Sequence, residues 1–302
     1  MANETILVTG ATGQVGKRLV PRLLSWREPG DAVRALVRTR EAAQRFEALG
    51  AQAVVGDITE AADRKRALDG VALVVNTAAT FRDPGVAESG MYAVNRDAAV
   101  ALARESMQAG VRRFVQVSTI HVYGPGVGRP VREDDELRAP DAGEGERHRV
   151  YPHSKREAEE QVKALCAETG FDVITLRLPF VYGDRDPHIE NALAHFSLGD
   201  RAAHALMPMG HHADVAQGVQ RALRTARPER PGYVAYNIAG DAASTMYELF
   251  ELGGREFDVA AAAGRTVEDP WLGVPDITRA YRELGFRPIY PTAKAAWRDG
   301  AL

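Results

Sequence analysis

The amino-acid sequence predicts an α/β fold with a doubly wound parallel sheet and a smaller C-terminal lobe. Over the first 120 residues, short apolar and β-branched runs alternate with longer segments of helical period, which is the pattern of βαβ units. Runs such as Leu73-Val74-Val75 are apolar throughout, which is typical of strands covered on both faces. With 302 residues, 45% of them hydrophobic, the chain is long enough to bury a sizeable core.

Five strands are expected in this first part, at near-regular spacing. They are Thr5–Thr9, Val33–Val37, Gln52–Val55, Leu73–Asn76 and Phe114–Ser118. Helices are expected between them, each closed by a glycine or a polar turn. They are Gln14–Ser25, Glu41–Leu49, Ala62–Asp69 and Val94–Ala109.

The rhythm breaks after the fifth strand, where residues 122–149 are rich in glycine, proline and charge and predict a surface excursion. Two further helix and strand pairs follow, separated by an irregular segment. They are Ser154–Thr169 with Asp172–Leu178, and Ala213–Thr225 with Val234–Ile238.

This order predicts two parts of unequal size. Residues 1–178, rejoined by residues 211–239, are expected to form the core. Residues 179–210 and 240–302 are expected to form the smaller lobe, facing the carboxyl ends of the strands, where ligands bind in folds of this class.

Composition points to small molecules as partners. Lys and Arg number 38 against 41 Asp and Glu, so the net charge of −3 offers no broad cationic surface for nucleic acid or for a membrane. The only cysteine, Cys166, is expected to be a half-buried helix residue, which fits a reducing compartment. No secretion signal or membrane-spanning run is visible, and we expect a cytoplasmic protein.

A glycine-rich turn connects the first strand to the first helix. Gly10, Gly13 and Gly16 occur where a dinucleotide site needs a tight turn, close backbone approach to a pyrophosphate, and close packing of helix on strand. The phosphates would cap the helix N-terminus. The residues expected to hold them are Gly10, Thr12, Gly13, Gln14, Val15 and Gly16.

The spacing of these glycines, G-x-x-G-x-x-G, resembles the short-chain dehydrogenase/reductase superfamily, and the whole turn resembles its extended branch, the NAD-dependent epimerase/dehydratase type. This resemblance implies a Rossmann-type fold, an isologous dimer, and further cofactor contacts. Asp57 and Ile58 would meet the adenine, although Asp57 could equally cap the next helix. The other implied cofactor contacts are Ala78, Ala79, Pro179 and Val181.

The end of the second strand favours NADP(H), with NAD(H) as the alternative. Val37 stands where an acidic residue would meet a ribose, and Arg38 follows it. A guanidinium can bind a 2′-phosphate in a bidentate, charge-assisted way.

Tyr151 and Lys155 form the expected reaction centre. Tyrosine and lysine four residues apart at a helix start project from one face, one turn apart. A free phenol titrates near pH ~10, and a nearby ammonium would lower that pKa and make the tyrosine a usable acid or base. Both residues are also expected to contact the cofactor.

The resemblance implies further site residues. Thr119 takes the catalytic hydroxyl position, with Ser118 as the alternative, and Asn95 supports the site from a helix. His121, His153 and Phe180 are candidates to line the substrate pocket. No metal site is expected, because the histidines, including His211 and His212, lack carboxylates at ligand spacing; we expect surface or loop positions for them.

The expected reaction interconverts a carbonyl and a hydroxyl by hydride transfer with a Tyr/Lys/Thr proton relay. Dehydration is disfavoured, since Ile120 and His121 replace the acidic pair of dehydratases. No arginine occurs in residues 207–211, where nucleotide-sugar enzymes usually bind the substrate diphosphate. A nucleotide-sugar epimerase is the alternative, and a non-catalytic cofactor-sensing regulator is a third reading.

Overall fold

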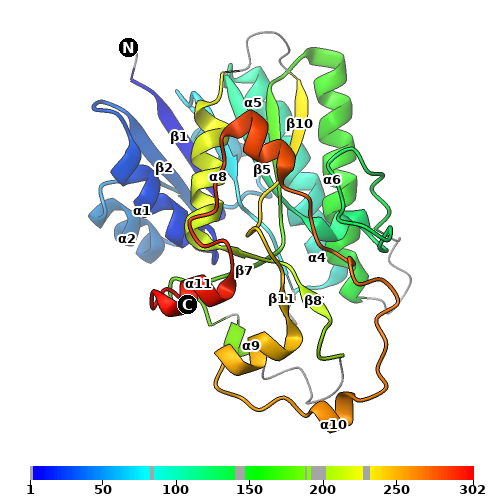
Figure 1. The fold of residues 1–302 in the computed structure, drawn as a ribbon. Coiled ribbons are helices and arrows are strands. Elements are labelled where there is room, and N and C mark those ends of the chain that lie inside the picture. The colour runs from blue at the N-terminus through cyan, green and yellow to red at the C-terminus, as the bar shows by residue number, and fades with distance from the viewer. Residues whose placement is uncertain (1–2, 82–84, 140–146, 188, 192–201, 227–231) are drawn as a thin grey trace.

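The computed structural model describes residues 3–81, 85–139, 147–187, 189–191, 202–226 and 232–302. Within these residues the centre is a seven-stranded parallel sheet of order β10-β6-β5-β4-β1-β2-β3 (Figure 1). The predicted α/β class with a doubly wound parallel sheet is confirmed. The strands are β1 Thr5–Thr9, β2 Ala32–Val37, β3 Gln52–Val55, β4 Leu73–Asn76, β5 Arg113–Thr119, β6 Val173–Leu178 and β10 Tyr233–Asn237.

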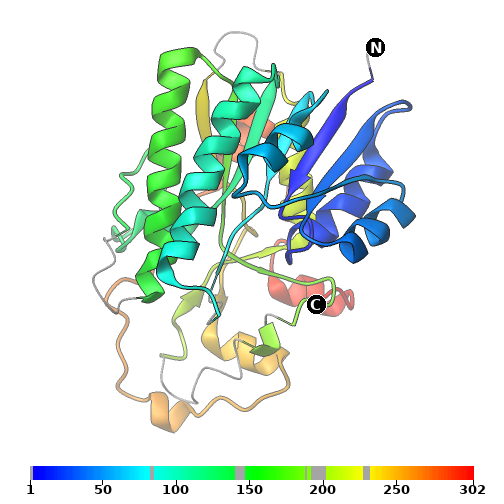
Figure 2. The same cartoon turned by 180° about the vertical axis from the view of Figure 1, so that it is seen from behind.

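Helices cover both faces of this sheet. On one face, α1 (Gly16–Trp26), α2 (Arg40–Ala48) and α8 (His212–Arg224) pack in one apolar cluster with the strands (Figure 1). On the other face, α3 (Ala61–Leu68), α5 (Ala99–Gln108) and α6 (Arg147–Thr169) form the second cluster, as Figure 2 shows. Successive strand residues alternate between the two clusters, so the strands are buried on both sides and need apolar residues throughout.

The order of the strands switches sides at β1, which pairs with β2 on one side and with β4 on the other, all three strands being parallel. The loops after β1 and β4 therefore meet at one point. Gly10 has a φ of +68°, and a Cβ there would lie 2.5 Å from the backbone nitrogen of Ala78, so only glycine fits. Such a switch point is where α/β sheets bind ligands.

The smaller lobe lies beyond the carboxyl ends of the strands (Figure 1). It contains two short strand pairs, β7 (Phe180–Tyr182) with β9 (Met209–His211), and β8 (Leu206–Met207) with β11 (Ser244–Thr245). Its helices are α9 Met246–Leu252, α10 Val259–Ala262 and α11 Ala293–Arg298.

The C-terminal segment does not stay in the lobe. Between α10 and α11 the chain returns to the core through the π-turn η3 (Ala280–Leu284). Ala280, Leu284 and Phe286 belong to the same apolar cluster as α1 and α8. The predicted domain division remains a prediction, but this part of residues 240–302 packs with the core.

Most predicted bounds agree with the structure within two residues, but two predicted helices and the predicted surface excursion differ more. Helix α6 begins at Arg147, seven residues before the predicted start, because Pro152 lies inside the helix instead of before it. The segment expected as one helix over 94–109 follows α4 (Glu88–Tyr92) and consists of a π-turn, η1 (Ala93–Ala98), and then α5.

The third difference concerns the predicted surface excursion, which is partly buried. The described part of residues 122–149 begins within the 3-10 helix η2 (Ile120–Tyr123) and contains the buried Val131. Val131 pairs with Pro275 from the C-terminal segment. The burial depends on a partner more than a hundred residues away, which local composition does not reveal.

Candidate active site

The glycine turn after β1 has the geometry of a phosphate-binding loop. The backbone nitrogen of Gly13 donates to the carbonyl of Gly10 over 2.9 Å. A Cβ on Gly16 would collide with Gly10 and Ala11, so this glycine lets α1 start directly against the strand. No side chain caps α1. Its N-terminus can therefore receive an anion through backbone N–H groups.

A cavity of about 280 Å³ opens beside this loop. Eight of the residues predicted to contact the dinucleotide line it: Gly10, Thr12, Gly13, Arg38, Asp57, Ile58, Ala78 and Ala79. Leu36, Val37, Gly56, Thr77, Thr80 and Val94 complete its lining. The other predicted contacts do not line it: Gln14, Val15, Gly16, Tyr151, Lys155, Pro179 and Val181. The lining residues and the uncapped helix fit the adenosine and phosphate half of a nicotinamide dinucleotide.

Arg38 is the cation of this cavity. It is exposed, and within the described part of the chain no hydrogen bond or ion pair involves its side chain. Arg40, two residues later, is instead paired with Glu47 at 3.4 Å. Val37 is buried in the core cluster, so no acidic group stands at the strand end.

Asp57 shapes the turn after β3. Its carboxylate accepts hydrogen bonds from the backbone nitrogen and the hydroxyl of Thr59, both at 2.8 Å. It does not cap α3, whose N-cap is Glu60 and lacks a side-chain cap. Since Asp57 also lines the cavity, the adenine role remains a prediction that its geometry permits.

Three predicted residues converge at the carboxyl end of β5. Thr119 ends the strand, and its side chain shares a hydrogen bond with Tyr151. Lys155 lies one helical turn after Tyr151 on α6 and donates from Nζ to the carbonyl of Val117 over 2.9 Å. Lys155 is only 2% exposed. The strand and the helix are thereby joined at two points of one site.

Ser118 does not take part in this group. Its hydroxyl donates a hydrogen bond to the carboxylate of Glu159, deeper in the protein. The structure therefore selects Thr119 as the hydroxyl next to Tyr151, and Ser118 has a different partner.

The pKa of Tyr151 departs from the expectation that Lys155 would lower it. Burial raises the pKa of Tyr151 to about 12, and the hydrogen bond with Thr119 opposes this rise only in part. Burial also lowers the pKa of Lys155 to about 8, with the charge of Glu159 acting in the opposite direction. The ammonium is directed to a backbone carbonyl, so removal of the phenol from water dominates.

Asn95 holds the cofactor-side loop. Its amide accepts from the backbone nitrogen of Thr80 at 2.8 Å and donates to the carbonyl of the same residue at 3.0 Å. It also donates to the hydroxyl of Ser154 on α6 at 3.2 Å. The π-turn that carries Asn95 is a form often found at functional sites. Asn95 thus ties the cavity loop to the helix of Tyr151.

Phe81 is a residue that the sequence analysis missed. Its ring lies edge-on to the ring of Tyr151, with 4.6 Å between the centroids, yet Phe81 remains 41% exposed. It follows Thr80, which lines the cofactor cavity. An aromatic residue directly after the Ala78-Ala79-Thr80 run was the available sequence signal.

The predicted substrate residues are dispersed. His153 shares a hydrogen bond of 2.6 Å with the hydroxyl of Tyr92, and His121 is exposed just after Thr119. Phe180 is half-buried against the apolar cluster of the smaller lobe. Their contacts with substrate remain predictions.

The expectation of surface or loop positions is wrong for His211 and His212. Both are buried, because β9 and α8 carry them between the core and the smaller lobe. His212 pairs with the buried Asp186 at 2.7 Å, and His211 contacts the carbonyl of Ala301 at 2.8 Å. Across the described residues, no group of three or more His, Cys, Asp or Glu could hold a metal. Nor does any described helix have the length and apolar character needed to span a bilayer.

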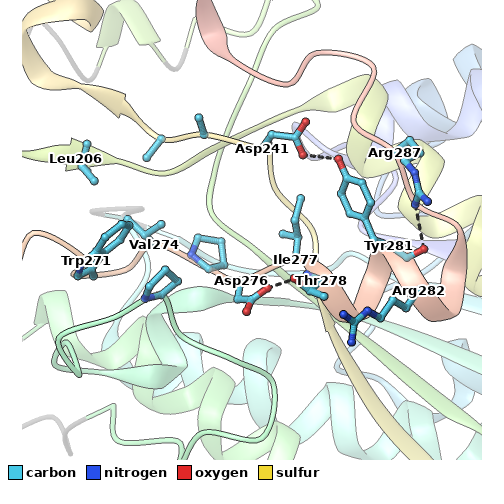
Figure 3. Close-up of a pocket in the computed structure, with 14 residues that line it drawn as sticks. Leu206, Asp241, Trp271, Val274, Asp276, Ile277, Thr278, Tyr281, Arg282 and Arg287 are labelled. Atoms are coloured by element: carbon cyan, nitrogen blue, oxygen red, sulfur yellow. Dashed lines mark hydrogen bonds between the residues drawn. The ribbon is translucent and has the colours of Figure 1, made fainter.

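A second cavity, of about 860 Å³, lies between the C-terminal segment and the loop after β10 (Figure 3). Tyr281 donates a hydrogen bond to Asp241 across it, and the guanidinium of Arg287 lies 4.2 Å from the Tyr281 ring (Figure 3). None of the predicted site residues lines this cavity. The reaction centre is therefore a separate place in the fold.

Comparison with known proteins agrees with this geometry. Residues 6–239 match the model of the NAD dependent epimerase/dehydratase family, and the chain belongs to this family. It thus is an enzyme of the oxidoreductase type built on the extended short-chain dehydrogenase/reductase fold, as the resemblance predicted.

Two relatives and one solved structure illustrate the range of this family. The chain is 27% identical over 294 residues to a 4-hydroxy-2-methyl-3-oxo-4-farnesyl-3,4-dihydroquinoline-1-oxide ketoreductase of Stigmatella aurantiaca, covering 90% of this chain and 82% of the relative. It is 33% identical over 186 residues to a UDP-glucose 4-epimerase of Vibrio cholerae, covering 60% and 52%. The dTDP-glucose 4,6-dehydratase DesIV of Streptomyces venezuelae, solved with NAD, is 25% identical with a TM-score of 0.75, covering 97% and 95%.

Proposed function

We propose that this protein is an NADP(H)-dependent reductase of ketones or aldehydes on apolar small molecules. The observation that carries the proposal is the contact between the Thr119 hydroxyl and Tyr151 at the end of β5, with Lys155 one turn away, in a fold that has a cavity beside its glycine turn. A hydroxyl, a phenol and an ammonium together are the parts of a proton relay for a carbonyl group.

The residues of the cavity would hold the dinucleotide in a defined orientation. The Gly10–Gly16 turn and the start of α1 would receive its phosphates, and Asp57 and Ile58 its adenine. When bound, the dinucleotide supplies or accepts the hydride. We expect the nicotinamide end to extend from the cavity toward Thr119 and Tyr151.

Tyr151 would act as the proton donor. With a pKa raised to about 12, the phenol stays protonated at neutral pH, which suits donation to a carbonyl oxygen as its carbon gains a hydride. Thr119 would donate a hydrogen bond to the same oxygen and hold it in place. Lys155 would supply positive charge below the phenol as the proton leaves.

The preference for NADP(H) rests on Arg38. This guanidinium has no protein partner among the described residues, while its neighbour Arg40 is already paired. A cation without a partner at the edge of a cofactor cavity is suited to a 2′-phosphate. The absence of an acidic residue at Val37 removes the group that would bind a free ribose hydroxyl.

The apolar substrate class rests on Phe81 and on the segment before α8. Phe81 is 41% exposed beside Tyr151, where an apolar substrate could contact it. Residues 206–210 contain no cation that could meet a diphosphate. The ketoreductase among the relatives has a farnesyl-quinoline substrate in its name, which agrees with this class.

Nucleotide-sugar epimerisation is the second candidate, and the match to a UDP-glucose 4-epimerase favours it. Absorbance at 340 nm over a panel of carbonyl compounds separates the possibilities. A reductase consumes NADPH in proportion to product, an epimerase converts UDP-sugars with no net consumption, and a cofactor-sensing regulator binds NADPH without turnover. Absence of NADPH consumption with every apolar ketone and aldehyde would refute the proposed function.

A further inference from the structure

A buried ion pair lies behind the reaction centre. The carboxylate of Glu159 on α6 meets the guanidinium of Arg177 on β6 at 2.8 Å. Their side chains are 1% and 3% exposed, so both charges are removed from water. Such a pair adds little net stability compared with apolar residues of the same volume. Stability alone therefore does not explain its presence next to the site.

The carboxylate of Glu159 is held from three elements. Arg177 donates to it through Nε and Nη2, and the hydroxyl of Tyr233 on β10 donates at 2.9 Å. The hydroxyl of Ser118 on β5 donates the remaining hydrogen bond. Arg177 is itself fixed by the hydroxyl of Tyr123 at 2.8 Å. This carboxylate has little freedom to move.

Glu159 is also placed in register with the relay. It follows Lys155 by four residues and Tyr151 by eight, so the three side chains lie along one face of α6. Its partner Ser118 stands between Val117, whose carbonyl accepts the Lys155 ammonium, and Thr119, which contacts Tyr151. Through Ser118, the Glu159 carboxylate therefore holds the part of β5 that contacts both Lys155 and Tyr151.

The Lys155 ammonium needs a nearby negative charge. Burial lowers its pKa to about 8, and Glu159 is the group that acts in the opposite direction. Other titratable groups packed around Glu159 and Arg177 are Tyr151 on α6, Tyr123 on η2, Tyr233 on β10 and the buried Glu133, whose carboxylate accepts a hydrogen bond from the backbone nitrogen of Asn237. Burial raises the pKa of all three tyrosines, so at neutral pH none of them supplies an anion.

We propose that Glu159 is a positioning residue of the proton relay. Through Ser118 it fixes residues 117–119 against α6, and through its charge it keeps the buried Lys155 ammonium protonated at working pH. This inference rests on the proposed function for its consequence in catalysis. Its physical content, the ionisation of Lys155, can be measured without any turnover.

The test is a direct titration of Lys155 in the folded chain. The sequence has five lysines, Lys17, Lys65, Lys155, Lys163 and Lys294, so Cε-labelled lysine gives a simple NMR spectrum. Lys155→Met assigns the buried signal by its loss. Glu159→Gln keeps the hydrogen-bonding shape and removes the charge. We expect it to lower the pKa of Lys155 by about one unit.

Glu157→Gln is the matched control, because it breaks an ion pair of the same helix with Arg96 at 2.8 Å. We expect the Lys155 titration to be unchanged in this variant. Since Glu159→Gln leaves the Arg177 charge without its carboxylate and can destabilise the fold, Glu159→Gln with Arg177→Met removes both charges. The Lys155 pKa should stay below the wild-type value in the double variant as well.

Catalysis provides the second measurement. In Glu159→Gln the fall of kcat/KM at alkaline pH should begin about one pH unit lower than in the wild type, with NADPH affinity at pH 6 unchanged. An unshifted Lys155 titration in both Glu159 variants, or an equal shift in Glu157→Gln, overturns the inference. A Tyr151→Phe variant with full activity would instead refute the proposed function and leave the titration result standing.

Discussion

The ammonium of Lys155 donates a hydrogen bond to the carbonyl oxygen of Val117 over 2.9 Å. The lysine that follows Tyr151 by one turn is thus bonded to the strand that carries Thr119. A nearly unexposed ammonium is costly, because burial favours its neutral form. This unfavourable burial of a charge occurs at the point where Lys155 joins helix α6 to β5.

Removal of the phenol should abolish turnover without weakening cofactor binding. In Tyr151→Phe we expect kcat for NADPH-dependent carbonyl reduction to fall by roughly 10²–10⁴-fold, since the proton donor is lost. The Kd of NADPH, from quenching of protein fluorescence, should stay within about twofold of wild type. Tyr247→Phe, an exposed tyrosine on α9, is the control and should retain activity. Undiminished turnover in Tyr151→Phe would exclude the phenol from the reaction.

The side chain of Arg38 should discriminate between the two dinucleotides. We expect Arg38→Ala to raise the Kd of NADPH by about 10- to 100-fold, the effect of losing one or two charge-assisted hydrogen bonds to phosphate. The Kd of NADH should change by less than about threefold. Arg40→Ala, which loses only the ion pair with Glu47, should leave both values near wild type. Equal weakening of both cofactors in Arg38→Ala would contradict a role for Arg38 in phosphate recognition.

Lys155 should lower stability in a pH-dependent way. The pKa of Lys155 is about 8 in the folded chain against 10.5 for a lysine in water, so the unfolded chain holds more protons between these values. Wild-type stability should therefore rise as the pH increases from about 8 to 10.5, and the full cost of burial is present below pH 8. Lys155→Met should gain about 1–2 kcal/mol at pH 7, after loss of the bond to Val117, and less at pH 10.

Thermal unfolding of wild type and Lys155→Met at pH 7 and pH 10 measures this difference. The melting temperature of the variant should exceed that of the wild type by a few degrees at pH 7. The variant should also be inactive, because it lacks the lysine of the proposed relay. A gain that grows with pH has the wrong sign and would show that Lys155 is not destabilised by burial.

Phe81 should determine the preference for apolar substrates. We expect Phe81→Ser to raise KM for a bulky aryl or prenyl ketone by about tenfold, the value of a lost apolar contact of this size. KM for a small aliphatic ketone should change less than about threefold, and kcat should remain similar. Leu49→Ser changes an exposed apolar residue at the end of α2 and serves as the control. An equal change of KM for both substrates would assign Phe81 a structural role only.

Much of the fold and part of the site could be predicted from local sequence. Strands β1, β3 and β4 have the predicted bounds, because apolar β-branched runs of this length have few other conformations in a globular chain. The glycine turn was predictable since Gly10 needs a positive φ and Gly16 tolerates no Cβ. The spacing of Tyr151 and Lys155 was readable from helical period alone.

The remaining features depend on partners far away in the chain. Ser118 and Thr119 have similar side chains, but the Ser118 hydroxyl is bonded to Glu159, some forty residues later, while Thr119 lies beside Tyr151. His211 and His212 are polar residues whose burial is not visible in the local sequence, because it results from the packing of the lobe on α8. The pKa of Tyr151 follows desolvation, which no spacing in the sequence reports.

The sequence by itself determined the α/β class, the dinucleotide turn and the residue types of the proton relay. These depend on local steric preferences and on periodicity within one strand or helix. The tertiary structure alone decided that the Ser118 hydroxyl is bonded to Glu159, that Arg38 has no partner among the described residues while Arg40 has one, and that Phe81 lies beside the phenol. Burial and long-range contacts set these features, and both are properties of the folded chain rather than of any segment of it.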